Sequence, residues 1–134
     1  LGGSGIFGVE FFVDKKGGVI FSELSPRPHD TGMVTMYTQN YSQFDIHARV
    51  LTGMPLPEVK LIQSGASHVI LAEENATGDY TIEGVEKALE DEDVDYRIFG
   101  KPSLKPYRRM GVILASSLDK AKMAAKKISV VSKL

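Results

Sequence analysis

The chain has 134 residues, 43% hydrophobic and 25% charged, a composition typical of a globular protein rather than a disordered or fibrous one. Its 16 Lys and Arg residues nearly balance 17 Asp and Glu residues, so it lacks the broad positive charge that attracts nucleic acids or anionic membranes. It has no cysteine and no apolar run near the roughly 20 residues of a membrane span. We expect a cytoplasmic protein of one or two small domains, whose metal ligands, if any, are mainly carboxylates.

The N-terminal part of the sequence predicts a β-hairpin. Residues 6–13 and 19–24 are rich in Phe, Val and Ile, and they flank the turn-forming run Asp14-Lys15-Lys16-Gly17-Gly18. The next segment, residues 25–32, contains Pro26 and Pro28, which restrict their own backbone and that of the preceding residues. We predict a stiff, irregular loop there.

A helix is expected to follow this loop. Apolar residues recur at helical spacing from Tyr41 onward, Ser42 and Asp45 have the spacing of a capping box, and Gly53 stands where the helix would stop. Prolines 55 and 57 then predict a linker, because proline can neither continue a helix nor donate to a sheet. We place a domain boundary here, giving domains of residues 1–57 and 58–134.

The second domain alternates strands and helices. Strands are predicted at residues 67–72, 94–98 and 110–115, and the last of these is apolar enough to be central in a sheet. A helix is predicted over residues 81–90, and Ser117 can cap a final helix with Leu118, Ala121, Ala125 and Ile128 facing inward. The fold class is therefore α+β.

Two glutamates, Glu10 and Glu23, interrupt the apolar strands of the hairpin. A four-residue turn over residues 15–18 makes them cross-strand neighbours on one face. Carboxylates placed opposite each other repel, so a cation between them is an economical explanation, and two carboxylates with water and phosphate oxygens suit Mg²⁺. A solvated outer face of the sheet explains the pair equally well.

Charged side chains gather at two further places. The proline-stiffened loop carries Arg27, His29 and Asp30, as a preformed binding loop could, although a simple surface crossing has the same composition. Near the predicted central strand, Lys101, Arg108 and Arg109 lie within nine residues. Together they could hold a phosphate, but taken alone they are more simply solvated strand ends.

The hairpin strand 8–13 and the run Phe21-Ser22-Glu23-Leu24-Ser25-Pro26-Arg27-Pro28-His29-Asp30-Thr31-Gly32-Met33 resemble the C-terminal part of an ATP-grasp enzyme. The resemblance is strongest to the formate-dependent phosphoribosylglycinamide formyltransferases. It continues through residues 99–102 and 108–112 and so extends over nearly the whole chain. It implies the end of an ATP-grasp domain, with an antiparallel hairpin plus helix, followed by a small α/β C-terminal domain.

The resemblance also implies roles for the two glutamates and for five of the charged residues in the other two places. The two glutamates would bind Mg²⁺ together with ATP, and Arg27 would stabilise a phosphorylated intermediate. The remaining four residues would bind glycinamide ribonucleotide: Asp30, Lys101, Arg108 and Arg109. Many ATP-grasp relatives have Asn where this chain has Ser25, so a third protein ligand to the metal is in doubt.

The implied reaction is the formylation of glycinamide ribonucleotide by formate and ATP, through formyl phosphate, in purine biosynthesis. The family's N-terminal substrate domain and ATP-covering lid would precede residue 8, so we expect this chain to be a C-terminal fragment, inactive alone, of an enzyme that is homodimeric in full-length form. Carboxylating relatives of the aminoimidazole ribonucleotide type are an alternative, although they typically have His-Asn-Ser-Gly where this chain has residues 29–32, His-Asp-Thr-Gly. A non-catalytic interaction module is the other alternative.

Overall fold

The structure is a computed structural model that describes residues 2–133. Contacts within the chain divide it into two compact units, residues 1–62 and 63–134. Each unit is described by itself. Together they contain helices and antiparallel sheets, which confirms the predicted α+β class.

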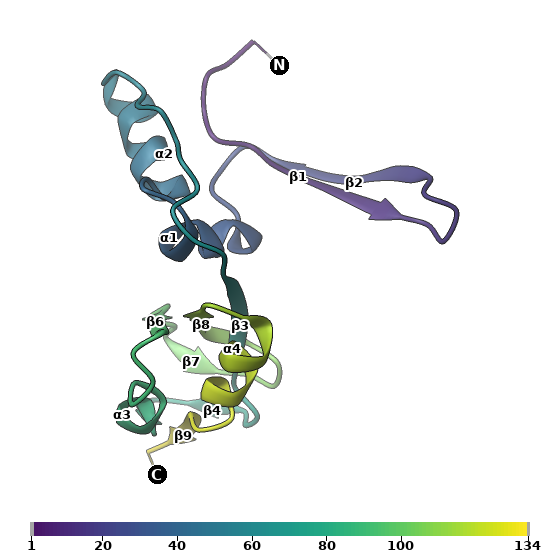
Figure 1. Cartoon of the computed structure of the whole chain (residues 1–134). Coiled ribbons are helices and arrows are strands. Elements are labelled where there is room, and N and C mark those ends of the chain that lie inside the picture. Colours follow the sequence, from purple (N-terminus) through teal and green to yellow (C-terminus); the bar gives the residue numbers. More distant parts are fainter. Residues whose placement is uncertain (1, 134) are drawn as a thin grey trace. The chain divides into compact units, whose positions relative to one another are not determined.

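The first unit begins with the predicted hairpin, formed by β1 (Gly8–Val13) and β2 (Val19–Ser25) (Figure 1). The connecting turn is closed by a hydrogen bond of 3.0 Å from Gly17 N to Asp14 O, and Gly17 has a φ of 83°. A residue with a side chain is strained at that φ, so glycine suits this position. The Asp14 side chain accepts from Lys16 N and Gly18 N and completes the turn.

Two short helices follow the hairpin, one beginning inside the predicted loop of residues 25–32 and one beyond it, where no element was predicted. The 3₁₀ helix η1 (Asp30–Val34) starts inside the predicted loop and leads into α1 (Thr35–Thr38). The irregular region is therefore shorter than predicted, because Asp30 already belongs to a helical turn capped by the His29 side chain. The proline-containing part remains free of regular structure, as its restricted backbone requires.

Helix α2 (Gln43–Thr52) confirms the predicted helix and both of its ends. Ser42 and Asp45 form the expected capping box, and Gly53 ends the helix in the left-handed conformation. After the prolines, residues 58–62 return to the end of α1, where Ile62 N donates to Thr38 O at 2.8 Å. The first compact unit thus extends to Ile62, and the domain division at residue 57 stays a prediction.

The main sheet of the second unit has the order β3-β8-β6, all antiparallel. Its strands are β3 (Ala66–Leu71), β8 (Arg109–Ala115) and β6 (Val94–Ile98), which confirms the three predicted strands and the central place of β8. Helix α4 (Leu118–Ala125) is capped by Ser117, as predicted, and packs on this sheet.

Two small two-stranded sheets and one helical turn complete the second unit. Strand β4 (Ala76–Thr77) pairs with β7 (Ser103–Leu104), and β5 (Tyr80–Glu83) pairs with β9 (Ser129–Ser132). A single helical turn, α3 (Val85–Ala88), follows β5. The core of this unit combines the inner faces of β8 and α4 with residues of the neighbouring elements, including Ile70, Ala72, Val94, Leu104 and Val130.

Two predictions for the second unit are wrong in part. The helix predicted over residues 81–90 is a strand and one helical turn, because residues 80–83 pair with β9 and Gly84 has a φ of 80°. The final helix ends at Ala125, so Ile128 lies outside it. Leu118 is 47% exposed, whereas Ala121 and Ala124 are buried against the sheet.

Candidate active site

Glu10 and Glu23 are direct partners in the β1–β2 register. The prediction of this pairing is confirmed, but its geometry differs from the one assumed. Val13 pairs with Val19, so the turn is one residue longer than predicted, and a bulge between Glu10 and Phe11 shifts the register back. The bulge leaves Ser22 as the extra residue of β2 and brings the two glutamates opposite each other.

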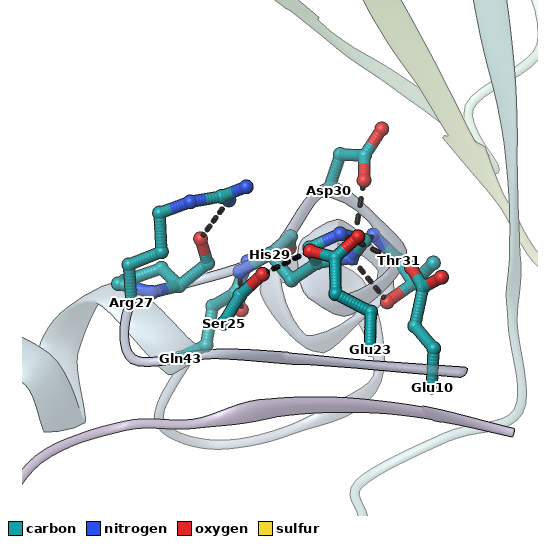
Figure 2. Close-up of polar contacts among 9 residues, drawn as sticks. Glu10, Glu23, Ser25, Arg27, His29, Asp30, Thr31 and Gln43 are labelled. Carbon is teal, nitrogen blue, oxygen red and sulfur yellow. Dashed lines mark hydrogen bonds and ion pairs between the residues drawn. The ribbon is translucent and has the colours of Figure 1, made fainter. Parts of the chain in front are cut away.

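Each carboxylate has a hydrogen-bond donor beside it (Figure 2). The Ser25 hydroxyl donates to Glu23 Oε1 in a short hydrogen bond. Ser25 is buried, with 6% of its surface exposed. Glu10 lies on the other strand, β1, and its Oε1 is 3.1 Å from Nε2 of His29 in the loop. The two donors hold like-charged groups next to each other while leaving further carboxylate oxygens for a ligand.

The loop that carries His29 is anchored to the start of α2 by Gln43. The Gln43 side chain accepts from His29 N at 3.0 Å and donates to His29 O at 2.6 Å. A Cβ added at Gly32 would lie 2.3 Å from Gln43 Oε1, so the close approach of the amide requires glycine at that position. Gln43 was not predicted as a site residue, since nothing in its spacing distinguishes it from a surface residue of a helix.

Asp30 and Arg27 flank this histidine. Asp30 Oδ1 lies 3.2 Å from His29 Nδ1, on the opposite side of the ring from the nitrogen that faces Glu10. Arg27 Nη1 donates to Pro28 O at 3.1 Å, and in Figure 2 its guanidinium lies apart from Glu10 and Glu23. The structure thus brings Glu10 and Glu23 together, connects Asp30 to them through His29, and places Arg27 on the same loop but pointing elsewhere.

The donor set of this site fits Mg²⁺ bound jointly with a phosphate ligand. Within residues 2–133, no group of three or more His, Asp or Glu side chains could hold a metal alone. Mg²⁺ is commonly bound by one or two carboxylates, with waters and substrate phosphates completing its octahedron. Glu10 and Glu23 supply that number of carboxylates, and the Glu10 side chain is 40% exposed and accessible to a ligand.

The three predicted cations lie in the second unit, around the turn that leads into β8. Lys101 Nζ lies 5.9 Å from the centre of the Phe99 ring. Arg108 Nη1 donates to the backbone and hydroxyl oxygens of Ser103, at 2.9 and 2.8 Å. Arg109 is the exposed first residue of β8. Arg108 therefore also has a structural role that the sequence did not indicate.

The turn between β7 and β8 presents this cluster on an unusual backbone. Tyr107 has a φ of 62°, and Arg108 N donates to Lys105 O at 2.9 Å across the turn. Pro106 occupies the second position of this turn, where proline is favourable. Tyr107 occupies the third position, where a positive φ normally calls for glycine. The turn is secured by a hydrogen bond of 2.9 Å from Tyr107 N to Ala72 O.

Comparison with known families matches both parts of the chain. Residues 1–44 match the ATP-grasp domain, and residues 65–131 match the family described as PurT, C-terminal. In the described part of the chain, no helix is long and apolar enough to cross a membrane.

Similar curated proteins are named formate-dependent phosphoribosylglycinamide formyltransferase. The chain is 51% identical to that of Trichormus variabilis, over 98% of this chain and 35% of the relative. It is 56% identical to that of Synechococcus elongatus, over 86% of this chain and 29% of the relative. The chain thus spans about a third of the length of these relatives.

Solved structures of two kinds resemble the chain. N5-carboxyaminoimidazole ribonucleotide synthetase from Thermotoga maritima has a TM-score of 0.87 and 35% identity, over 98% of this chain and 38% of that one. A structure named glycinamide-RNase-transformylase T, from Mycobacterium tuberculosis, has a TM-score of 0.66 and 27% identity, over 94% of this chain and 32% of that one.

Proposed function

The chain belongs to the PurT C-terminal family, and from this premise we propose that it forms part of an enzyme that formylates glycinamide ribonucleotide with ATP and formate. The observation that carries the proposal is the pairing of Glu10 with Glu23 beside the Ser25–Gly32 loop, in a chain 51% identical to a formyltransferase over nearly its whole length. The proposal concerns the longer protein, because the chain spans 35% of that relative.

Glu10 and Glu23 would hold Mg²⁺ in this enzyme, together with the phosphates of ATP. The bound ion would screen the phosphate charges and orient the transferred group. The chain itself contributes the positions of the two carboxylates, which are set by the β1–β2 register and the donors Ser25 and His29. These contacts support the role because they keep the two carboxylates side by side.

Asp30, Lys101, Arg108 and Arg109 would bind glycinamide ribonucleotide, the cations at its phosphate. Arg109 is exposed and Lys101 extends over an aromatic ring, so both can offer charged donors to an anion. Arg108 uses one nitrogen for Ser103, and its other guanidinium hydrogens remain for a ligand. The hydrogen bonds to Ser103 would pre-orient its planar group and so lower the ordering cost on binding.

The reaction would proceed by transfer of the γ-phosphoryl group of ATP to formate, giving formyl phosphate and ADP. The amine of glycinamide ribonucleotide would then attack the formyl carbon and release phosphate. Arg27, whose guanidinium is exposed, would stabilise the phosphorylated intermediate. We expect this chain alone to be inactive, since positioning both substrates requires the rest of the longer protein, which we propose acts as a homodimer.

Carboxylation of aminoimidazole ribonucleotide is the second candidate. It is favoured by the TM-score of 0.87 to the Thermotoga maritima carboxyaminoimidazole ribonucleotide synthetase. The identity of 35% to that protein is lower than the 51% to a formyltransferase, which favours formyl transfer.

The decisive experiment is an assay of the full-length protein with ATP and Mg²⁺, comparing labelled formate plus glycinamide ribonucleotide with bicarbonate plus aminoimidazole ribonucleotide. We expect product only in the first reaction. Product only in the second would move the protein to the carboxylating enzymes, and product in neither would contradict both candidates.

Two double variants locate the activity within this chain. We expect Glu10→Gln/Glu23→Gln to lower kcat about 10²-fold to 10³-fold, because metal stabilisation of transition-state charge is worth several kcal/mol. Arg108→Ala/Arg109→Ala should raise the KM for the ribonucleotide about 10²-fold to 10⁴-fold, as loss of charge-assisted hydrogen bonds costs about 1.5–3 kcal/mol for each of the two arginines.

The matched controls are Glu58→Gln and Arg97→Ala, which remove charges that pair with exposed neighbours, Lys60 and Asp95. Both controls should retain normal kinetics. If the site variants retain them too, the assignments of the glutamates and arginines are wrong.

A further inference from the structure

His29 has no part in the proposed chemistry, yet it lies at the centre of the contacts in the candidate site (Figure 2). Its side chain is only 13% exposed, whereas the carboxylate it contacts, Glu10, is 40% exposed. The contact joins Nε2 of the ring to Glu10 Oε1 at 3.1 Å. A largely buried imidazole beside an exposed carboxylate is well placed to restrict that carboxylate's motion.

The position of His29 is set by its neighbours on both sides. Gln43 holds its backbone N–H and C=O together, at 3.0 and 2.6 Å, so the residue is anchored to α2. Gln43 is itself held by Thr35, whose Oγ1 accepts from Gln43 N at 3.0 Å. A rigid element thus fixes the histidine, and the histidine can in turn fix a neighbour.

The ring lies against the same strand that carries Glu10. A Cβ added at Gly8 would approach His29 Cβ to 2.9 Å, closer than real Cβ contacts. Gly8 and Glu10 are two residues apart in β1, so they share one face of the strand. Because Gly8 has no side chain, His29 can pack close to this face of the strand, where its Nε2 contacts the Glu10 carboxylate.

The Glu10 contact is common to the hydrogen-bonding states that the ring can adopt. Thr31 N–H, at 3.4 Å, donates to Nδ1 only when that nitrogen carries no hydrogen, whereas an ion pair between Nδ1 and Asp30 requires the hydrogen. Nε2 carries a hydrogen in the first state and in the protonated ring of the second, and it faces Glu10 Oε1 at 3.1 Å. Nε2 can therefore hold Glu10 whether or not the ring is charged.

We propose that His29, anchored by the Gln43 amide, is a positioning residue whose Nε2–H orients the Glu10 carboxylate for metal binding. This inference rests on the proposed function, in which Glu10 binds Mg²⁺. Hydrogen bonds to metal-binding carboxylates hold them in place, and their loss typically costs about 10-fold to 100-fold in metal affinity or activity. His29 would act on Glu10 as the Ser25 hydroxyl acts on Glu23.

Two substitutions separate this role from a structural one. In His29→Asn the amide can replace Nδ1, preserving the contact with Thr31 N–H, but it cannot reach Glu10. In His29→Gln the longer amide can place a donor near Nε2 and preserve the contact with Glu10. The probe is Mn²⁺, a spectroscopic substitute for Mg²⁺, titrated into the full-length protein saturated with ADP and followed by electron paramagnetic resonance.

We expect His29→Asn to weaken Mn²⁺ binding about 10-fold to 100-fold and His29→Gln to stay within about 3-fold of the wild type. The double variant Glu10→Gln/His29→Asn should be no weaker than Glu10→Gln alone, because His29 acts through Glu10. Thermal unfolding of each variant tests whether the fold is intact.

The outcomes distinguish the two proposals. Normal Mn²⁺ binding by His29→Asn, combined with weak binding by Glu10→Gln, would overturn the role of His29 alone. Normal binding by Glu10→Gln would overturn the metal site and the inference with it. The reverse ranking, with His29→Gln weaker than His29→Asn, would show that the cap on Thr31 matters and would also overturn the inference.

Discussion

The two compact units differ in what they bury. The second unit has a continuous core that includes the fully buried Leu104, Met110 and Ile113, and Leu114 is also fully buried. In the first unit, Met33 is the one buried hydrophobic residue among those that the structure describes. Three polar residues of the first unit, Ser25, Thr38 and Ser42, are buried instead. One unit is built around apolar packing, and the other is built around hydrogen bonds.

The hairpin of the first unit makes the difference clearest. Its apolar side chains are exposed on both faces, including Phe12 at 65% and Phe21 at 60%. Exposed apolar patches of this kind commonly mark surfaces that another protein segment covers. The candidate site therefore stands in the unit with the weaker core, where hydrogen bonds from Ser25 and Gln43 supply the order that packing does not.

The largest expected effect is the loss of a core side chain in the second unit. We expect Met110→Ala to destabilise the chain by about 2–5 kcal/mol, because it leaves a cavity beneath the central strand. The matched control is Met123→Ala on α4, where the methionine is 66% exposed and the expected change is below about 0.5 kcal/mol. Urea unfolding followed by circular dichroism measures both, and equal effects would contradict the contrast between core and surface.

A change on the hairpin should alter association more than folding. We expect the 134-residue chain to self-associate through β1 and β2, and Phe12→Asp/Ile20→Lys to shift sedimentation towards the monomer. Each buried apolar side chain of this size contributes about 1.5–3 kcal/mol to such contacts. The control Leu51→Asp changes another exposed apolar residue outside the hairpin. If the wild-type chain is monomeric, the exposed strands β1 and β2 do not mediate self-association.

Loss of a helix cap should have a smaller effect, and it should differ between the units. Ser42→Ala removes a full capping box from α2, whereas Ser117→Ala removes a single bond of 3.3 Å to Lys120 N. We expect Ser42→Ala to cost about 1 kcal/mol and Ser117→Ala about half of that. Thermal unfolding of each variant checks the order, and a larger loss for Ser117→Ala would contradict it.

The smallest expected effect concerns Asp93 in the second unit. Hydrogen bonds from Lys120 and Ser116 lower the pKa of Asp93 below its ordinary value of 3.8. Its pairing therefore contributes stability that is present above pH 3.8 and is lost as pH falls through the lower pKa of the folded state. The pKa of Lys120 is raised by the same pair, so the contribution is also lost in strongly alkaline solution.

Unfolding of wild type and Asp93→Asn across the pH range tests this pair. We expect a small difference at neutral pH that disappears in strong acid and shrinks in concentrated salt, because the pair is exposed. A difference that persists in strong acid would mean that the substitution acts by another route than charge.

The pairing of Glu10 with Glu23 shows how a sequence prediction can be correct while its reasoning is incomplete. Two deviations, a longer turn and a bulge at Ser22, cancel in the register. The bulge was not predictable, because it is set by strand twist and by packing rather than by a turn residue. The prediction of a helix over residues 81–90 was wrong for a related reason, because pairing of β5 with β9 overrides the helical spacing of the apolar residues.

Local signals in the sequence determined the hairpin, the capping box of α2 and the Ser117 cap, and they also identified β8. The hairpin and the caps form between residues near one another in the sequence, and β8 is a continuous apolar run, so their patterns are readable directly. The tertiary structure alone decided the bulge, the β5–β9 pairing and the anchoring of His29 by Gln43, a residue 14 positions away. Such contacts depend on where the chain returns in space, and no short sequence pattern encodes that return.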